Sequence, residues 1–534
     1  MDNDKRIIIA VVLSMAVLFA YPYFIETFLP APPAPGKADG SAAVEETSVR
    51  DGEDGGVFAD GRPAATAPAS PTSPAVDEKL TTVETPLFSA VFTNVGGALR
   101  SWKLKGYRTA LAEDAGNIEL VGLAGAGATL ETTLSAGGFD ERIVFTPSAD
   151  SIEIGADGKA QLRFTWTSPQ GVTVVKTYAF SGGGYVVEGS LKVRNGSQST
   201  LRAALATELR AGYPAENDYS YYHRGPVIYA DGKVTRHAAD DDTSSGRGEF
   251  EWLGVEDKYF LQALIPRTEG AVGWSMESPS TATAVSSLSL PLDLEPGEGV
   301  VYSFDAYLGP KVYDILTALD RNLVESIEFG FFSFMAKPFL VVLNFFERYI
   351  GNYGIAIILL TCIIKILFYP LTKQSLNAMR EMQKIQPQLM ALKEKYKDDK
   401  QKLNKELMEL YKRYKINPLG GCLPMVLQIP VFIALYEVLS VAIELRHAPF
   451  ILWIADLSAK DPYYITPVLM GGSMLLQQKM SPTTVDPQQA KIMLIMPVVF
   501  TFMFLNFPAG LVVYWLVNNI LSIVQQYYIQ RTAR

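Results

Sequence analysis

The segment Tyr353–Lys373, YGIAIILLTCIIKILFYPLTK, carries the most informative charge in this chain. Its first part is apolar enough to lie in lipid, but Lys365 interrupts the apolar run shortly before Pro370. A charged side chain inside a span costs roughly 3 kcal/mol even on lenient insertion scales, so Lys365 is a candidate functional residue. The alternative is that Lys365, about one turn from the end of the segment, lays its stem along lipid and places its ammonium among the headgroups.

Length and composition indicate a membrane protein with several domains. The chain has 534 residues, 48% of them hydrophobic, and contains long uncharged runs. Acidic residues are in excess between the first two apolar segments, whereas residues 371–417 carry an excess of basic ones. Cys362 and Cys422 are the only cysteines and lie in apolar segments, which favours packing over a disulfide, redox or metal role.

The amino-terminal region predicts an anchor followed by a linker. Residues 1–28 place Lys5 and Arg6 before an apolar run long enough to span a membrane. The run is longer than a usual signal core and ends in AYPYF, which favours an uncleaved anchor over a cleaved signal peptide. Its basic end is expected inside, so the following segment is exported. Residues 29–79 are rich in Pro, Ala, Gly, Ser and acid, which predicts a disordered linker.

Residues 80–325 predict a single large β-domain outside the membrane. Apolar and polar residues alternate in QLRFTWTS (161–168) and in SLKVRNGS (190–197), where a turn is expected at Asn195-Gly196. This pattern is typical of a β-sandwich. The region has no metal-ligand spacing, nucleophile elbow or phosphate loop, so we expect a binding or spacing module rather than an enzyme.

Residues 326–350 resemble a further span in hydropathy, but Lys337-Pro338 interrupts the apolar run. Both the amino terminus and residues 373–416 are expected inside, so only one crossing can lie between the first span and that loop. Residues 353–372 make this crossing. Residues 326–350 are therefore expected to form an amphipathic helix that lies in the interface on the outer face of the membrane.

The loop 373–416 predicts two amphipathic helices that form an antiparallel cytoplasmic hairpin around KDDK (397–400). A charged hairpin is most often simply solvated. This one also has apolar positions and many basic residues, which favours a docking surface for an anionic or hydrophobic partner. The candidate docking residues are Lys384, Lys393, Lys397, Asp398, Asp399 and Lys400.

Four more apolar segments follow, at about 418–440, 462–478, 491–507 and 510–528. Their prolines, glycines and amides are most simply explained by close helix packing. The third segment is short, which would thin the bilayer around it. Together with 1–28 and 353–372 these segments predict six spans with both termini inside.

Four long motifs stand out in the second half of the chain: NPLGGCLPMVLQIPVFIALY, ELRHAPFILWIADLSAKDPYYITPVLMGG, QQKMSPTTVDPQQAKIM and FPAGLVVYWLVNN. They resemble the core of the YidC family of membrane protein insertases. The similarity runs from about Tyr302 to the end, and the anchor plus outer β-domain is similar to the Gram-negative type within the wider YidC/Oxa/Alb family. It implies a polytopic helical membrane protein with a five-helix insertase core (351–530) and a large periplasmic β-supersandwich similar to sugar mutarotases.

The resemblance also implies a hydrophilic groove that opens to the cytoplasm and to lipid. Lys365 matches the single positive residue of the groove, where most relatives have arginine. Lysine keeps the positive charge but lacks the planar guanidinium group that can bind a carboxylate with two hydrogen bonds. The implied groove-lining residues are Thr361, Gln428, Asn506, Tyr514, Trp515 and Asn518. Residues implied along the path of a substrate into lipid are Pro424, Leu427, Val431, Phe500 and Phe502.

The function implied is insertion and assisted folding of proteins in the inner membrane of a Gram-negative bacterium, alone or with the Sec translocon. Expected partners are nascent membrane proteins, the lipid bilayer, the Sec translocon with its accessory subunits, and the ribosome and signal recognition particle. No specific nucleic acid sequence, catalytic residue, metal or cofactor is expected. Two other classes remain open, a solute transporter and an envelope carbohydrate enzyme. A transporter is less favoured because Glu437 is the only acidic residue within a later span that could pair with Lys365.

Overall fold

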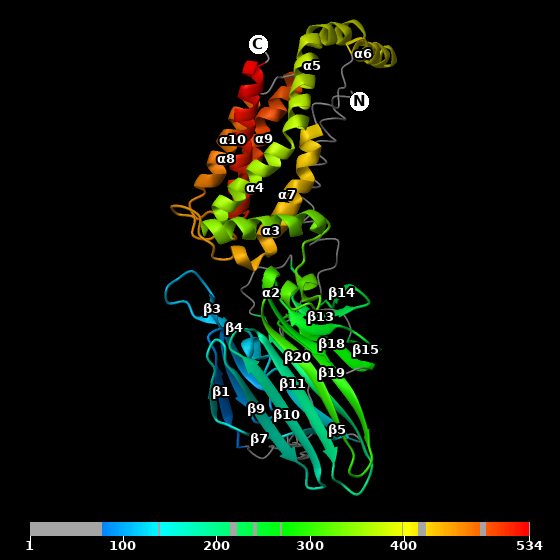
Figure 1. Ribbon diagram of the computed structural model, residues 1–534. Coiled ribbons are helices and arrows are strands. Elements are labelled where there is room, and N and C mark those ends of the chain that lie inside the picture. Colours follow the sequence, from blue (N-terminus) through cyan, green and yellow to red (C-terminus); the bar gives the residue numbers. More distant parts are fainter. Residues whose placement is uncertain are drawn as a thin grey trace, which may run out of the picture. The chain divides into compact units, whose positions relative to one another are not determined.

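The computed structural model describes residues 77–136, 139–213, 222–238, 243–267, 270–397, 399–414, 423–480 and 487–532 (Figure 1). The anchor expected at 1–28 and nearly all of the linker expected at 29–79 lie outside these residues, as does Asp398. The side chains of Lys400 and Pro424 are likewise outside the described part.

Strands between Leu80 and Pro310 form three sheets in the described part of the chain. In order across the sheet, the first consists of β4 (Asn117–Glu119), β3 (Leu99–Arg108), β2 (Phe88–Thr93), β1 (Leu80–Glu84) and β8 (Ser151–Glu153). The second consists of β14 (Lys233–Arg236), β13 (Gly225–Ala230), β16 (Trp252–Glu256), β17 (Phe260–Pro266), β20 (Gly299–Pro310), β11 (Val186–Asn195), β10 (Val172–Ser181), β9 (Lys159–Thr167) and β7 (Thr146–Pro147). The third consists of β15 (Ser244–Gly248), β18 (Val272–Ser280), β19 (Thr283–Leu294), β12 (Leu201–Gly212), β5 (Glu131–Ala136) and β6 (Phe139–Arg142).

The alternating pattern places one face of each strand in the core, and the predicted β-sandwich is confirmed. Leu162 and Phe164 of β9 are fully buried, while the residues between and beside them are exposed. The ring of Phe92 in β2 lies 5.0 Å from that of Tyr178 in β10, so the first sheet packs on the second. After Asn195 the chain passes from the second sheet to the third, and the Asn195 amide donates to the carbonyls of Ser199 and Leu294.

A fully buried lysine links all three sheets. The Lys176 ammonium in β10 donates to the carbonyl of Leu130 (2.5 Å), the hydroxyl of Thr132 (2.6 Å) and the carbonyl of Gly96 (3.3 Å). Burial lowers the pKa of Lys176 well below its usual value, and the nearby Glu131 opposes this shift. The three donors of the ammonium thus have three acceptors, which is how a buried amine avoids a large desolvation cost.

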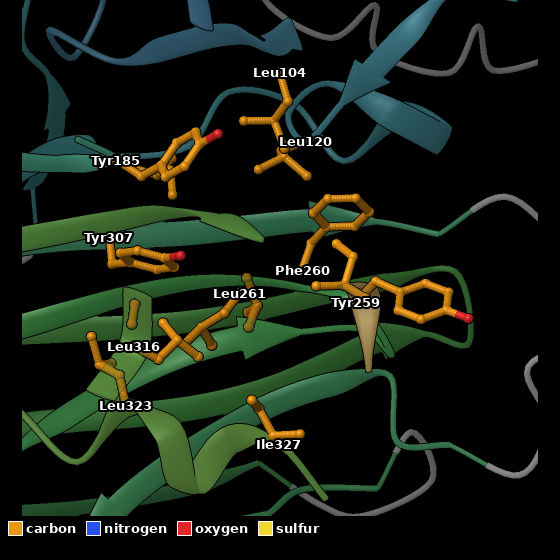
Figure 2. Close-up of a cluster of buried hydrophobic side chains, with 14 of the residues drawn as sticks. Leu104, Leu120, Tyr185, Tyr259, Phe260, Leu261, Tyr307, Leu316, Leu323 and Ile327 are labelled. Atoms are coloured by element: carbon orange, nitrogen blue, oxygen red, sulfur yellow. The ribbon is translucent and has the colours of Figure 1, made fainter. Parts of the chain in front are cut away.

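Short helical segments complete the core of the β-domain. The 3₁₀ helix η1 (Leu123–Gly125) follows β4, and α2 (Tyr313–Ala318) and η2 (Leu323–Ser326) follow β20. Figure 2 shows Leu316 of α2 and Leu323 of η2 beside Leu261 of β17. These three side chains are fully buried, so the segment after β20 is part of the hydrophobic core.

The remainder of the described chain is helical (Figure 1). Helix α3 (Ser333–Ile350) is followed by α4 (Tyr353–Leu367), α5 (Tyr369–Lys395) and α6 (Lys400–Tyr414). Helix α7 (Leu423–Val441), the 3₁₀ helix η4 (Ile443–Leu445), α8 (Ile465–Met480), α9 (Pro487–Phe504) and α10 (Ala509–Thr532) complete the chain. Helix α10 packs against α4 and α8, and α8 packs against α9.

The helix predicted at 353–372 is shorter than expected. It ends at Leu367, and the following helix bends away by 61°. Pro370 lies in the first turn of α5, where its missing N–H is tolerated, but it could not continue α4 without losing a hydrogen bond. The bend places Lys365 in the last turn of α4.

Within the described residues, only Ala509–Ile529 is a single helix long and apolar enough to cross a membrane. The bent pair Tyr353–Leu367 and Tyr369–Lys395 also passes as one unit, and Leu427–Val441 and Leu494–Phe504 are shorter apolar helices. The count of six spans therefore stays a prediction.

Replacement of Lys176 by methionine tests its role in joining the sheets. Lys176→Met should lower the local free energy of unfolding of β5 and β10 by roughly 2–4 kcal/mol, because buried carbonyls lose their donor. Hydrogen–deuterium exchange of the full-length protein in detergent measures this change. Lys192→Met, at an exposed position of the adjacent strand β11, is the matched control and should leave exchange unchanged. Equal protection in both variants would contradict the assignment.

Candidate functional site

The position of Lys365 is set by how α4 begins and ends. The Asn352 side chain accepts from the backbone N–H of Ile355 (3.1 Å) and donates to the carbonyl of Phe450 (2.9 Å), which fixes the start of the helix. The bend after Leu367 fixes its end. Because a helix C-terminus carries partial negative charge, a lysine in the last turn is favourably placed.

The ammonium of Lys365 is directed toward α10. It donates to the hydroxyl of Ser522 at 2.7 Å, and the Ser522 hydroxyl donates to the carbonyl of Asn518 at 2.8 Å. The Gln525 amide donates to the backbone carbonyl of Lys365 at 3.4 Å. Helices α4, α8, α9 and α10 contain no aspartate or glutamate, and within the described residues Lys365 forms no ion pair. The site thus holds one unneutralised positive charge.

Thr361 lies one turn before Lys365 on α4 but forms its hydrogen bond within its own helix rather than with α10. Its side chain is 1% exposed, and its hydroxyl donates to the carbonyl of Ile357 at 2.6 Å. A threonine that bonds back to its own helix has no proton left to donate. Thr361 therefore shares the face of Lys365 without offering a free donor.

Gln428 and Tyr514, both predicted as wall residues, contact each other. The Gln428 amide donates to the phenol oxygen of Tyr514, which is fully buried. Tyr514 precedes Ser522 by eight residues on α10, or about 12 Å along the axis, so this contact and that of Lys365 lie at different depths. The neighbouring ring of Trp515 lies 5.1 Å from that of Phe432 and 5.3 Å from that of Phe504.

Helix α10 carries a polar stripe of which the sequence motifs indicated only Asn518. The amide of Asn519 donates to the hydroxyl of Ser473 in α8 at 3.0 Å. The spacing of positions 518, 522 and 525, one helical turn apart, was the available signal in the sequence. The stripe consists of Asn518, Asn519, Ser522, Gln525 and Gln526, all buried or half-buried.

Other predicted residues lie apart from this contact region. Asn506 is exposed in the turn between α9 and α10. Along the predicted path into lipid, Phe502 is 69% exposed, Leu427 is half-buried, and Phe500 stacks on Trp515. Val431 is only 1% exposed and packs inside the bundle, so in this conformation it does not face a passing segment.

The predicted hairpin corresponds to α5 and α6. Ile385 and Leu389 of α5 pack against Leu410 of α6 in a small apolar cluster separate from the main core. The predicted docking side chains lie outside this cluster. Lys384 pairs with Glu381 at 2.6 Å, Lys393 and Lys397 are exposed, and the Asp399 carboxylate accepts from the backbone N–H of Lys402 at 3.0 Å.

The loop between α7 and α8 closes one end of the bundle. The buried Asp461 carboxylate accepts from Trp453 Nε1 (3.1 Å) and from the backbone N–H and hydroxyl of Thr466 (2.8 and 2.6 Å). The backbone N–H of Ala509 donates to the carbonyl of Ala459 at 2.7 Å. These bonds hold the loop against the start of α10, opposite the end that carries Lys365.

Family models match nearly all of the described chain. The model for the YidC periplasmic domain matches residues 80–342, and that for the 60Kd inner membrane protein matches residues 345–534. The membrane protein insertase YidC of Geobacter sulfurreducens is 45% identical over 84% of this chain and 86% of its own. That of Syntrophus aciditrophicus is 44% identical over 99% of this chain and 100% of its own.

The chain belongs to the YidC family of membrane protein insertases. Members of this family insert and chaperone membrane proteins and are not enzymes. Membership implies an inner-membrane location, a periplasmic β-domain, and nascent membrane proteins and lipid as partners. The family resemblance inferred from the motifs is thereby confirmed.

Two solved structures are similar to this chain, with low scores. The crystal structure of an active YidC insertase with its first transmembrane domain resolved covers 84% of this chain and 95% of its own, at 18% identity and a TM-score of 0.39. A galactose mutarotase related enzyme from Lactobacillus acidophilus covers 43% of this chain and 97% of its own, at 11% identity and a TM-score of 0.31. The family assignment rests on the sequence matches.

Close packing of α8 on α9 is tested at Gly471. A Cβ at this position would lie 1.9 Å from the Thr501 hydroxyl oxygen, whereas a Cβ at Gly472 would meet nothing within 4 Å. Gly471→Ala should therefore destabilise the bundle by roughly 1–3 kcal/mol, measured by thermal unfolding in detergent. Gly472→Ala is the matched control and should be neutral or slightly stabilising. Thr501→Ala should restore part of the loss. Equal stability of the two glycine variants would contradict this packing.

Proposed function

We propose that the protein inserts its substrates through a hydrated, positively charged groove lined by α4, α7 and α10, open to the cytoplasm and to lipid. The observation that carries this proposal is the half-buried ammonium of Lys365, which has a hydroxyl rather than a carboxylate as its partner. A structural charge in a bundle would normally be neutralised by an opposite one. A charge left unneutralised is available to an acidic group of a substrate.

The polar stripe of α10 supports a wet recess in the bilayer. Asn518 and Ser522 could hydrogen-bond with water beside Lys365, and Gln428 and Tyr514 would mark the deeper end of the recess. Water partway into the bilayer shortens the hydrocarbon that a hydrophilic tail must cross. A thinned bilayer around a short α9 would lower the cost further.

The apolar part of the substrate would then leave along α7 and α9. Phe502, with its exposed ring, and the half-buried Leu427 are the side chains that a passing segment would meet first. Burial in lipid supplies roughly 25 cal/mol per Å² of apolar surface. The membrane potential adds roughly 2.3 kcal/mol per charge per 100 mV. No nucleotide is needed in this scheme.

The proposed topology has six spans, five of them in the core, with both termini in the cytoplasm and the α5–α6 hairpin on the same side. Helix α3 would lie in the outer interface. It buries Ala336 and Leu340 while Phe334 and Tyr349 are 68% and 75% exposed, as expected for a helix lying on lipid. The basic hairpin would receive the ribosome, the signal recognition particle or the Sec translocon.

Removal of the groove charge should slow insertion of an acidic-tailed substrate more than that of a neutral-tailed one. Lys365→Ala should slow insertion of a substrate with an acidic translocated tail by roughly tenfold, about 1.4 kcal/mol, and affect a neutral-tailed substrate less. Reconstituted proteoliposomes with protease protection measure both rates. Lys365→Arg keeps the charge and should retain activity, and Lys479→Ala, at an exposed position at the end of α8, is a control outside the groove. Unchanged insertion of the acidic-tailed substrate would sink the proposal.

Photocrosslinking to a stalled nascent chain tests the exit path. A photoreactive residue at Gln428 or Phe502 should crosslink to the apolar segment, because both positions are at least partly exposed. The same residue at Thr361 or Val431 should crosslink much less, because both side chains are 1% exposed. Crosslinking from Val431 as strong as from Phe502 would instead indicate passage between tightly packed helices.

A further inference from the structure

We propose that Ser522 is a positioning residue that holds the Lys365 ammonium in the bundle and so makes its charge available to a substrate. This inference rests on the proposed function, because it concerns the same charge. Ser522 lies 157 residues after Lys365 in sequence and was not among the residues predicted from sequence. Its hydroxyl is the only side-chain partner of the ammonium within the described residues.

The hydroxyl of Ser522 is oriented as an acceptor toward Lys365. Its proton is donated to the carbonyl of Asn518 at 2.8 Å, so its lone pairs face outward. The ammonium donates into them at 2.7 Å. Ser522 is itself buried, at 9% exposure, so the contact holds the ammonium against α10.

Without this contact Lys365 would have another stable position. A lysine side chain is flexible, and from the last turn of a helix it can place its ammonium among lipid headgroups. Ile366 and Leu367, the next two residues, are 73% and 69% exposed, so the outer side of this turn is open. The bond to Ser522 favours the inward position.

A second contact holds the backbone of the same turn. The Gln525 amide donates to the Lys365 carbonyl at 3.4 Å, and Gln525 lies about one turn beyond Ser522 on α10. Side chain and backbone of Lys365 are thus both bound by α10. Ser522 accepts one of the three ammonium protons, and the other two have no partner in the described residues, so they are left for an acidic or carbonyl oxygen of a translocating tail.

A double-mutant cycle in the full-length protein separates positioning from general stability. Ser522→Ala should slow insertion of an acidic-tailed substrate roughly fivefold, since a hydrogen bond to a charged group is lost. In the Lys365→Ala background the same change should have no further effect. Ser522→Thr keeps the hydroxyl and should restore insertion. If Ser522→Ala lowers the amount of folded protein, Ser522→Cys, a weak acceptor of similar size, takes its place in the cycle.

The matched control is Ser473→Ala. The Ser473 hydroxyl also joins a neighbouring helix to α10, through Asn519, but does not touch Lys365, so its loss should affect acidic- and neutral-tailed substrates alike. An equal effect of Ser522→Ala with and without Lys365, or normal insertion by Ser522→Ala, would overturn the inference while leaving the proposed groove intact. Normal insertion of the acidic-tailed substrate by Lys365→Ala would overturn both.

Discussion

An ammonium group that is kept inside a helical bundle without a carboxylate constrains how the surrounding helices can be arranged. Desolvating a charge is costly, so Lys365 requires polar atoms within reach. Helix α10 supplies them through Ser522 and Gln525, which bind the side chain and the backbone of the same turn. Other polar residues of the stripe lie on the same helix, which packs against α4 and α8.

The β-domain contains a second buried lysine, and the two show different solutions to one physical problem. Lys176 gives each of its three donors an acceptor, and is completely buried where three sheets meet. Lys365 has one side-chain acceptor in the described chain and remains partly accessible. An ammonium whose three N–H donors all have acceptors stabilises a fold, whereas one with unpaired donors can still bind another acceptor.

Local breaks in the helices place the charge. Pro370 ends α4 shortly after Lys365, and the resulting bend directs α5 away from the bundle. At the other end of the bundle the Asp461 carboxylate binds the start of α8, and farther along the same helix Gly471 has no room for a Cβ against Thr501.

Periodicity was sufficient to predict the β-sandwich, because the alternation of apolar and polar residues is encoded within a few neighbouring residues. Sequence motifs were also sufficient for the family. Sequence patterns could not predict that the Thr361 hydroxyl donates to a carbonyl of its own helix or that Val431 faces inward. They also could not predict that α4 ends at Leu367 rather than at residue 372. The partner of Lys365 is 157 residues away in the chain, and no local pattern encodes such a distance. Burial and hydrogen bonding between distant helices are properties of the packed bundle, so only the folded arrangement reveals which polar groups meet the charge.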